Sequence, residues 1–204
     1  MLPLPARSEL QRRLPRLLGG LFLFGFGTAL MVVADLGLGP WDVFHQGVSV
    51  HTSIPIGSVV IITGIAVLVL WIPLRERIGI GTLLNAVLIG VVMDLTLLWL
   101  GTPPSTIIRW LYLVGGVLIV GVGSGYYIGA GLGPGPRDGL MTGLAKRGWP
   151  IGLARFGVEL MALIGGWLLG GTIGAGTVLF ALGIGPLVHV LLPRLTVRPV
   201  TSSR

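Results

Sequence analysis

The chain contains one short polar signature twice, each time between two apolar segments. The first copy covers residues 37–47 and reads Gly-Leu-Gly-Pro-Trp-Asp-Val-Phe-His-Gln-Gly. The second covers residues 133–143 and reads Gly-Pro-Gly-Pro-Arg-Asp-Gly-Leu-Met-Thr-Gly. Their Gly-x-Gly-Pro-x-Asp core and final glycine align without a gap at an offset of 96 residues. Any fold of this chain must therefore place two equivalent polar turns inside apolar surroundings.

The similarity extends well beyond the two signatures. Residues 19–47 and 115–143 are identical at 11 of 29 positions at the same offset. At an offset of 95, residues 78–90 and 173–185 are identical at 8 of 13 positions, and the Pro-Ile-Gly of 55–57 matches that of 150–152. One single-residue deletion accounts for the change of offset. We interpret residues 17–101 and 107–192 as two copies of one unit, joined by a Gly- and Pro-rich turn.

The composition places both units in a lipid bilayer. Hydrophobic residues make up 53% of the chain and charged residues only 10%, whereas a soluble domain carries about 25% charged residues. Each unit contains three apolar runs of about 20 residues, the length of a helix that crosses the hydrocarbon core. We therefore predict an all-α membrane protein with a single membrane domain. Its six transmembrane helices are expected at 17–36, 55–71, 78–100, 107–128, 150–169 and 173–192.

Each signature is too short and too polar to be a further span. Gly37, Gly39 and Pro40 interrupt the preceding helix. Asp42 is well placed to cap a new helix by accepting hydrogen bonds from its first amides, and this helix would run to about residue 50. We predict a short broken or re-entrant helix after the first span of each unit.

The basic residues predict the orientation, because cytoplasmic loops carry an excess of Lys and Arg. With a basic N-terminal segment (1–16) and a basic tail (193–204) in the cytoplasm, 13 of the 14 Lys and Arg residues are cytoplasmic and Arg109 is outside. If the signatures were full spans, Arg75 and Arg77 would be outside. Three spans per unit is an odd number, so the units are predicted to be inverted relative to each other (3+3).

Several function classes are not expected. The chain has no cysteine, which excludes disulfides and thiol chemistry. Its net charge of +7 is explained by orientation signals, so no nucleic acid is predicted as a partner. His45 and His51 have no evident acidic partner, so we expect no metal site. No cluster of a nucleophile with an acid or base is evident, so we predict neither an enzyme nor a cofactor.

Inverted units with broken helices are a recurring plan of secondary transporters and some channels. Irregular backbone at membrane depth is tolerated where it is buried in protein or lines a wet cavity, and free amides at a helix N-terminus attract anions. We therefore predict a transporter or channel for a small solute, with an anion as one candidate. The predicted substrate-binding residues come from both signatures: Gly39, Pro40, Trp41, Asp42, His45, Gly135, Pro136, Arg137 and Asp138.

Two roles stay open for the charged signature residues. Asp42 and Asp138 are either helix caps, which we favour as their main role, or part of a site for cations or protons. Trp41 and Arg137 occupy equivalent positions, so the two halves of the site differ chemically. Arg137 either faces an anionic substrate or marks the cytoplasmic surface.

Three further ionisable residues are candidates for proton or ion coupling, because such groups inside a membrane are functional hypotheses by default. Glu159 follows Arg155 by four residues, so an intrahelical ion pair is the alternative. Asp94 and His189 each follow a matched glycine by four residues, and an interfacial position is the alternative for both.

The run at 37–47, the glycine-rich first helix and the Pro-Ile-Gly start of the next helix resemble the YczE/YyaS/YitT group of bacterial membrane proteins. The resemblance covers nearly the whole chain, and it implies a multi-pass protein of the bacterial inner membrane with suspected transport activity. It implies no substrate and no catalytic residue, and the second unit departs from the signature at Arg137 and Met141. The expected partners are membrane lipids and an unidentified small solute, and a homo-oligomer stays open. The alternative functions are a substrate-binding or accessory subunit of a larger transport or assembly complex, and a lipid translocase.

Overall fold

The computed structural model describes residue 2 and residues 6–197, and every regular element in that part of the chain is a helix. Six helices are long and apolar enough to cross a bilayer: α1 (Arg7–Ala34), α3 (Ile56–Leu74), α4 (Ile80–Leu97), α5 (Thr106–Gly129), α7 (Ile151–Leu168) and α8 (Ala175–Leu195). Two shorter helices, α2 (Pro40–Thr52) and α6 (Pro136–Ala145), contain the signatures. The prediction of an all-α membrane protein with six candidate spans is confirmed.

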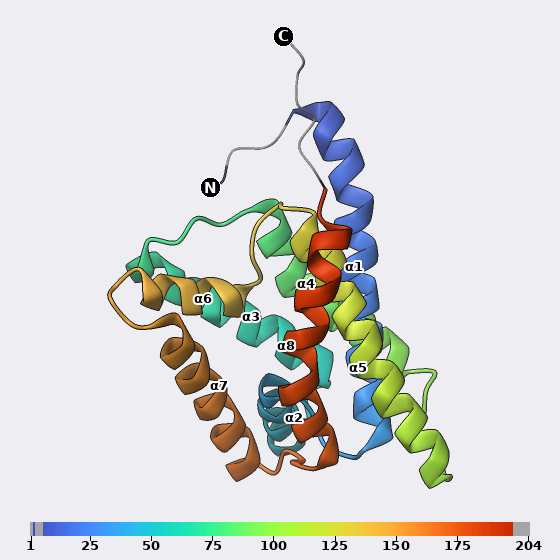
Figure 1. The fold of residues 1–204 in the computed structure, drawn as a ribbon. Helices are drawn as coiled ribbons and strands as arrows, with labels where there is room; N and C mark the ends of the chain where they lie inside the picture. Colours follow the sequence, from blue (N-terminus) through green and yellow to red (C-terminus); the bar gives the residue numbers. More distant parts are fainter. Residues whose placement is uncertain (1, 3–5, 198–204) are drawn as a thin grey trace.

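The first span is longer than the hydropathy pattern predicts. α1 begins at Arg7 rather than at residue 17, and its extra turns are polar and include an ion pair of 3.3 Å between Glu9 and Arg13. The guanidinium of Arg16 donates a hydrogen bond of 3.1 Å to the carbonyl of Leu195 near the end of α8. The start of α1 and the end of α8 therefore lie at the same end of the bundle (Figure 1).

α1 and α5 pack along each other and run antiparallel, on the right-hand side of the view in Figure 1. Gly20 lies against Gly123, and Gly27 lies against Gly116, so that the two backbones touch without side chains between them. Small residues at such positions allow helices to associate in lipid, where no hydrophobic driving force between helices exists. Gly20 aligns with Gly116, and Gly27 with Gly123, at the offset of 96. Each contact is therefore repeated by the equivalent residues of the other unit.

Hydrogen bonds between the units follow the same reciprocal pattern. Near the start of α4 and of α8, a backbone amide donates to a carbonyl that precedes the opposite signature: Gly81 to Leu132 at 2.9 Å, and Gly176 to Leu36 at 2.8 Å. An arginine of each first span also donates to a carbonyl at the end of the other first span: Arg13 to Ala130 at 3.3 Å, and Arg109 to Ala34 at 2.7 Å. Both pairs align at the repeat offsets. The units are therefore joined by matching contacts.

The two signature helices also pack across the units, α2 against α7 and α6 against α3. The indole of Trp71 on α3 donates a hydrogen bond of 3.0 Å to the carbonyl of Pro136, and Gly139 lies against the same indole. With 13 and 10 residues, α2 and α6 are only about 20 Å and 15 Å long, too short to cross about 30 Å of hydrocarbon. α6 lies nearer the end of the bundle where α1 begins, and α2 lies nearer the opposite end (Figure 1).

Candidate functional site: the cavity between the two signature turns

The first turns of α2 and α6 have the same construction. Gly39 and Gly135 occupy the N-cap positions, and a proline follows as the first helical residue, where its missing amide leaves no hydrogen bond unmade. The prediction that Asp42 and Asp138 cap these helices is wrong, because neither helix has a side-chain cap hydrogen bond. Each aspartate is the third residue of its helix, and its carboxylate has another partner.

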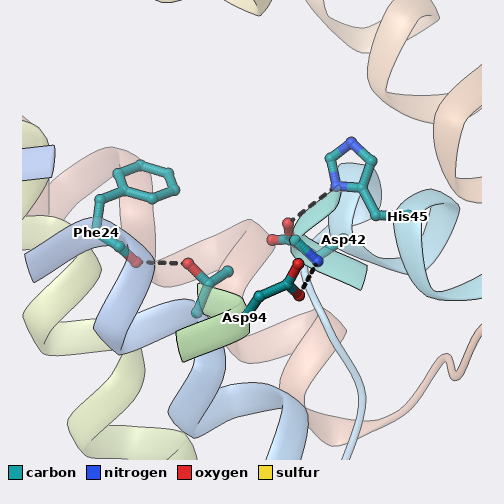
Figure 2. Close-up of polar contacts among 6 residues, drawn as sticks. Phe24, Asp42, His45 and Asp94 are labelled. Carbon is teal, nitrogen blue, oxygen red and sulfur yellow. Dashed lines mark hydrogen bonds and ion pairs between the residues drawn. The ribbon is translucent and has the colours of Figure 1, made fainter. Parts of the chain in front are cut away.

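Asp42 pairs with a histidine of its own helix. Its Oδ1 lies 3.4 Å from Nδ1 of His45 (Figure 2), and both residues are buried. The expectation that His45 lacks an acidic partner is wrong, since residues three apart on a helix are neighbours on one face. His45 also lines a void of about 20 Å³ together with Trp41 and Arg137. The centre of the His45 ring lies 6.3 Å from that of the Trp41 ring, so the Asp42–His45 pair packs beside Trp41.

Asp138 has a different partner, although it aligns with Asp42. The hydroxyl of Tyr127 on α5 donates a hydrogen bond of 2.9 Å to Asp138 Oδ2. Met31 is the equivalent of Tyr127 in the first unit and cannot donate in this way. Sequence reasoning missed Tyr127. The feature that could have identified it is a phenol near the end of an otherwise apolar span.

A cavity of about 200 Å³ lies between the two signatures. Residues of seven helices line it, among them Phe24, Pro40, Trp41, Asn85, Tyr127, Gly135, Pro136, Arg137, Asp138, Arg155, Glu159, Phe180, Ile184, Gly185 and Val188. Most of the predicted binding residues are therefore brought together: Pro40, Trp41, Gly135, Pro136, Arg137 and Asp138 line this cavity. Gly39 packs against Phe180 just beside it.

The two residues at the variable signature position meet at this cavity. The guanidinium of Arg137 lies 5.6 Å from the centre of the Trp41 ring and 5.9 Å from that of Phe24. Within residues 6–197, no acidic side chain lies within ion-pair distance of Arg137. The indole Nε1 of Trp41 is buried and has no hydrogen-bond partner among the described residues. The site therefore presents one cationic donor, Arg137, that makes no ion pair among the described residues, and Trp41 contributes the ring against which this cation lies.

Glu159 and Arg155 of α7 complete the charged lining. They form an ion pair of 3.0 Å, which confirms the intrahelical pair considered from their spacing. Both also line the cavity, so Glu159 lies where a coupling role would require it. The four charged residues of the lining are thus Arg137, Asp138, Arg155 and Glu159.

Asp94 and His189 do not reach the cavity. Asp94 on α4 accepts a hydrogen bond of 2.6 Å from the backbone amide of Gly57 (Figure 2). It accepts a second, of 3.0 Å, from the hydroxyl of Ser58. This carboxylate therefore caps the N-terminus of α3 from a neighbouring helix, and its negative charge interacts favourably with the positive end of the α3 dipole. His189, the equivalent residue, is exposed on α8.

Asp94→Ala is expected to lower the free energy of unfolding by about 1–2 kcal/mol, because it leaves the first amides of α3 without their acceptor. The measurement is the midpoint of thermal unfolding in detergent. His189→Ala is the matched control, since it removes the equivalent side chain and no hydrogen bond of the described chain. Equal midpoints for the two variants would contradict the capping role of Asp94.

Asn85 is a second lining residue that sequence reasoning did not select. It lies beside Gly135, just as its equivalent Phe180 lies beside Gly39. An amide inside an apolar span was the available signal. Within residues 6–197, no three His, Asp or Glu side chains gather where a metal ion could be held.

Comparisons with known proteins identify a family and several relatives. Residues 11–193 match the model of a family of unknown function, DUF6198. An uncharacterized protein of Haemophilus influenzae is 39% identical over 177 residues, which cover 86% of this chain and 81% of that protein. The uncharacterized membrane protein YczE of Bacillus subtilis is 39% identical over 195 residues, covering 92% and 89%.

A third relative is more distant. The uncharacterized protein YyaS of Bacillus subtilis is 27% identical over 184 residues, covering 85% of this chain and 89% of that protein. No solved structure matches. The resemblance to YczE and YyaS inferred from the signature is confirmed, and the chain belongs to the DUF6198 family of membrane proteins.

Proposed function

We propose that this protein is a transporter or channel of the bacterial inner membrane, and that its substrate is a small anion. The substrate would bind between the first turns of α2 and α6. The observation that carries the proposal is the position of Arg137, which lies over the ring of Trp41 without an ion-pair partner among the described residues, at one cavity between two equivalent polar turns.

The proposal includes an inverted repeat. Its support is reciprocal contact: the antiparallel α1–α5 pair, in which Gly20 meets Gly123 and Gly27 meets Gly116, and the matched hydrogen bonds between the units. A two-fold axis in the membrane plane relates the halves of many secondary transporters and leaves the binding site on or near that axis. A cavity lined by both signatures fits this arrangement.

The proposal also includes two re-entrant helices that enter from opposite sides. α2 and α6 are too short to span, and each is held by the spans of the other unit. The positive-inside rule puts α6, with Lys146 and Arg147, on the cytoplasmic side, and puts both termini there as well. α2 would then lie on the periplasmic side, close to Arg109.

The chemistry of the lining favours an anion. Arg137 supplies a cationic fork that matches carboxylate or phosphate oxygens, and two helix N-termini direct their dipoles to the same region. The positive charge of Arg155 is offset by Glu159 at 3.0 Å. Asp138, which has no cationic partner within ion-pair distance among the described residues, is the candidate for a proton that crosses with the anion. We assign no catalytic role to any of these residues.

The test is anion-dependent stabilisation and current. A ligand that binds only the folded state raises the unfolding midpoint, so the purified protein is heated with phosphate, sulfate, acetate and lactate, each as the sodium salt, with sodium gluconate as the ionic-strength control. Proteoliposomes on a supported membrane then report current after a jump in the stabilising anion. A raised midpoint and a current that protein-free vesicles lack are expected. Midpoints that rise no further with any of the four anions than with sodium gluconate at equal ionic strength would overturn the proposal.

A further inference from the structure

The two units differ in how closely their second and third spans pack together. We call the interface between these two helices the seam. In the first unit, α3 and α4 pack along each other, and Gly57 and Gly90 lie against each other's backbone. In the second unit, the equivalent α7 and α8 form no comparable contact. The aligned glycines, Gly152 and Gly185, have no atom within 4 Å of the position where a Cβ would stand. α7 and α8 are therefore separated where their counterparts are joined.

The sequence accounts for this difference. Val60 and Gly64 lie on the face of α3 that meets α4, and their equivalents on α7 are Arg155 and Glu159. Two charged side chains in place of a buried valine and a glycine prevent the close packing of α7 on α8. The Asp94 cap that joins α4 to α3 is also missing, since His189 stands in its place. α7 and α8 therefore lack both the small residues and the cap that hold α3 and α4 together.

The separated seam is one wall of the anion cavity. Arg155 and Glu159 line it from α7, while Ile184, Gly185 and Val188 line it from α8. The outer surfaces of both helices are apolar and exposed: Phe156 is 63% exposed, and Leu182 is 72% exposed. Both helices are long and apolar enough to cross a bilayer, so in the membrane a gap between them would open to hydrocarbon.

A free hydrophilic ion gains nothing from such an opening, because passage through hydrocarbon costs it most of its hydration energy. A molecule with a charged head and an apolar tail fits both the charged cavity and the apolar gap between α7 and α8. Its head would reach Arg137 and Trp41, and its tail would leave along Ile184 and Val188 into the bilayer. Arg155 stands in the seam, one turn into α7, where it would meet an anionic head before Arg137 does.

We infer that the substrate of this site is an anionic amphiphile, bound by its head at Arg137 and Trp41 with its tail in the α7–α8 seam. This inference rests on the proposed anion site and narrows its substrate: the small anion that the site binds becomes the head of a larger molecule, and the free anions of the stabilisation assay stand in for that head. A phospholipid and a fatty acid share this chemistry, and the experiment separates the two sources.

The chain has no native cysteine, so a single fluorescent label can report on the seam. Ile184→Cys places a bimane in the seam, and Leu182→Cys places one on the lipid-facing surface of the same helix as the matched control. Each labelled protein is reconstituted in phosphatidylcholine vesicles with increasing fractions of brominated phosphatidylglycerol, brominated phosphatidylcholine or brominated oleate. Brominated chains quench a bimane that they touch.

At position 184, the brominated anionic lipid is expected to reach half-maximal quenching at about a tenfold lower mole fraction than brominated phosphatidylcholine, which corresponds to one charge-assisted contact. Arg137→Gln should abolish this preference, and position 182 should show none. Preference for phosphatidylglycerol over oleate, or the reverse, identifies the source.

Quenching at 184 without a headgroup preference would overturn the inference, as would an equal preference at 182. The proposed anion function has a separate readout, since anion-dependent stabilisation and current can be present when the seam holds no tail. Failure of both sets of measurements would reject the anion site itself.

Discussion

Arg137→Gln is expected to weaken binding of the stabilising anion about 10- to 100-fold without loss of the folded protein. The guanidinium lies over Trp41 and Phe24 at the cavity and forms no ion pair with the described residues, so its removal leaves no acidic group unpaired. A hydrogen bond to a charged group contributes about 1.5–3 kcal/mol, and 1.4 kcal/mol corresponds to tenfold in affinity. The measurement is the anion concentration that half-saturates the rise in unfolding midpoint.

Two further variants test whether the loss of affinity is specific to the side chain of Arg137. Arg137→Lys keeps the charge but loses the planar fork and its stacking on the rings, so an intermediate affinity is expected. Arg12→Gln removes a charge from an exposed position near the start of α1, and affinity should be unchanged. If Arg12→Gln weakened binding as much as Arg137→Gln, overall charge would explain the effect, and the assignment of the site to Arg137 would fail.

Gly20→Leu is expected to destabilise the protein by about 3 kcal/mol or more, while Gly19→Leu should be tolerated. A Cβ at residue 20 would stand 2.6 Å from the amide nitrogen of Tyr127 and 2.8 Å from the carbonyl of Gly123. These are backbone atoms that cannot rotate away, so α1 and α5 would have to separate, and overpacking of this kind costs a few kcal/mol. A side chain at residue 19 meets nothing within 4 Å and would extend into lipid.

The measurement is the unfolding midpoint in detergent, together with the yield of monodisperse protein. The second unit supplies an independent pair, because Gly116 lies against Gly27 and Gly115 has nothing within 4 Å. Gly116→Leu should behave as Gly20→Leu, and Gly115→Leu as Gly19→Leu. Equal midpoints within each pair would contradict the glycine contact between α1 and α5.

Much of the fold was predictable, because both lipid and repetition leave a direct mark on a sequence. Spans of about 20 apolar residues must be helical in a bilayer, and the aligned prolines and glycines show where each unit is interrupted. The length of α1 was underestimated because its first turns are polar and carry no hydropathy signal. Their helical structure depends on local ion pairs such as Glu9–Arg13 and on contact with the end of α8.

The site was predictable in part. The signature pointed to Trp41 and Arg137, since both stand at the same position of two turns that an antiparallel arrangement brings together. The partners of the two aspartates differ in this respect. Asp42 and His45 are three residues apart on a predicted helix, so their contact could have been read from the spacing. Asp138 accepts a hydrogen bond from Tyr127 of another helix, and this contact depends on how α5 packs against α6, which one sequence does not specify.

The central claim is that the two signatures enter the membrane from opposite sides and meet at one site. Single cysteines at His51 and Lys146, both exposed, test it directly, because one lies in the last turn of α2 and the other follows α6. Intact cells are treated with a membrane-impermeant thiol reagent, and a second sample is treated after lysis. We predict labelling at position 51 in intact cells and at position 146 only after lysis. Labelling of both positions from the same side would contradict the inverted arrangement and the shared site that depends on it.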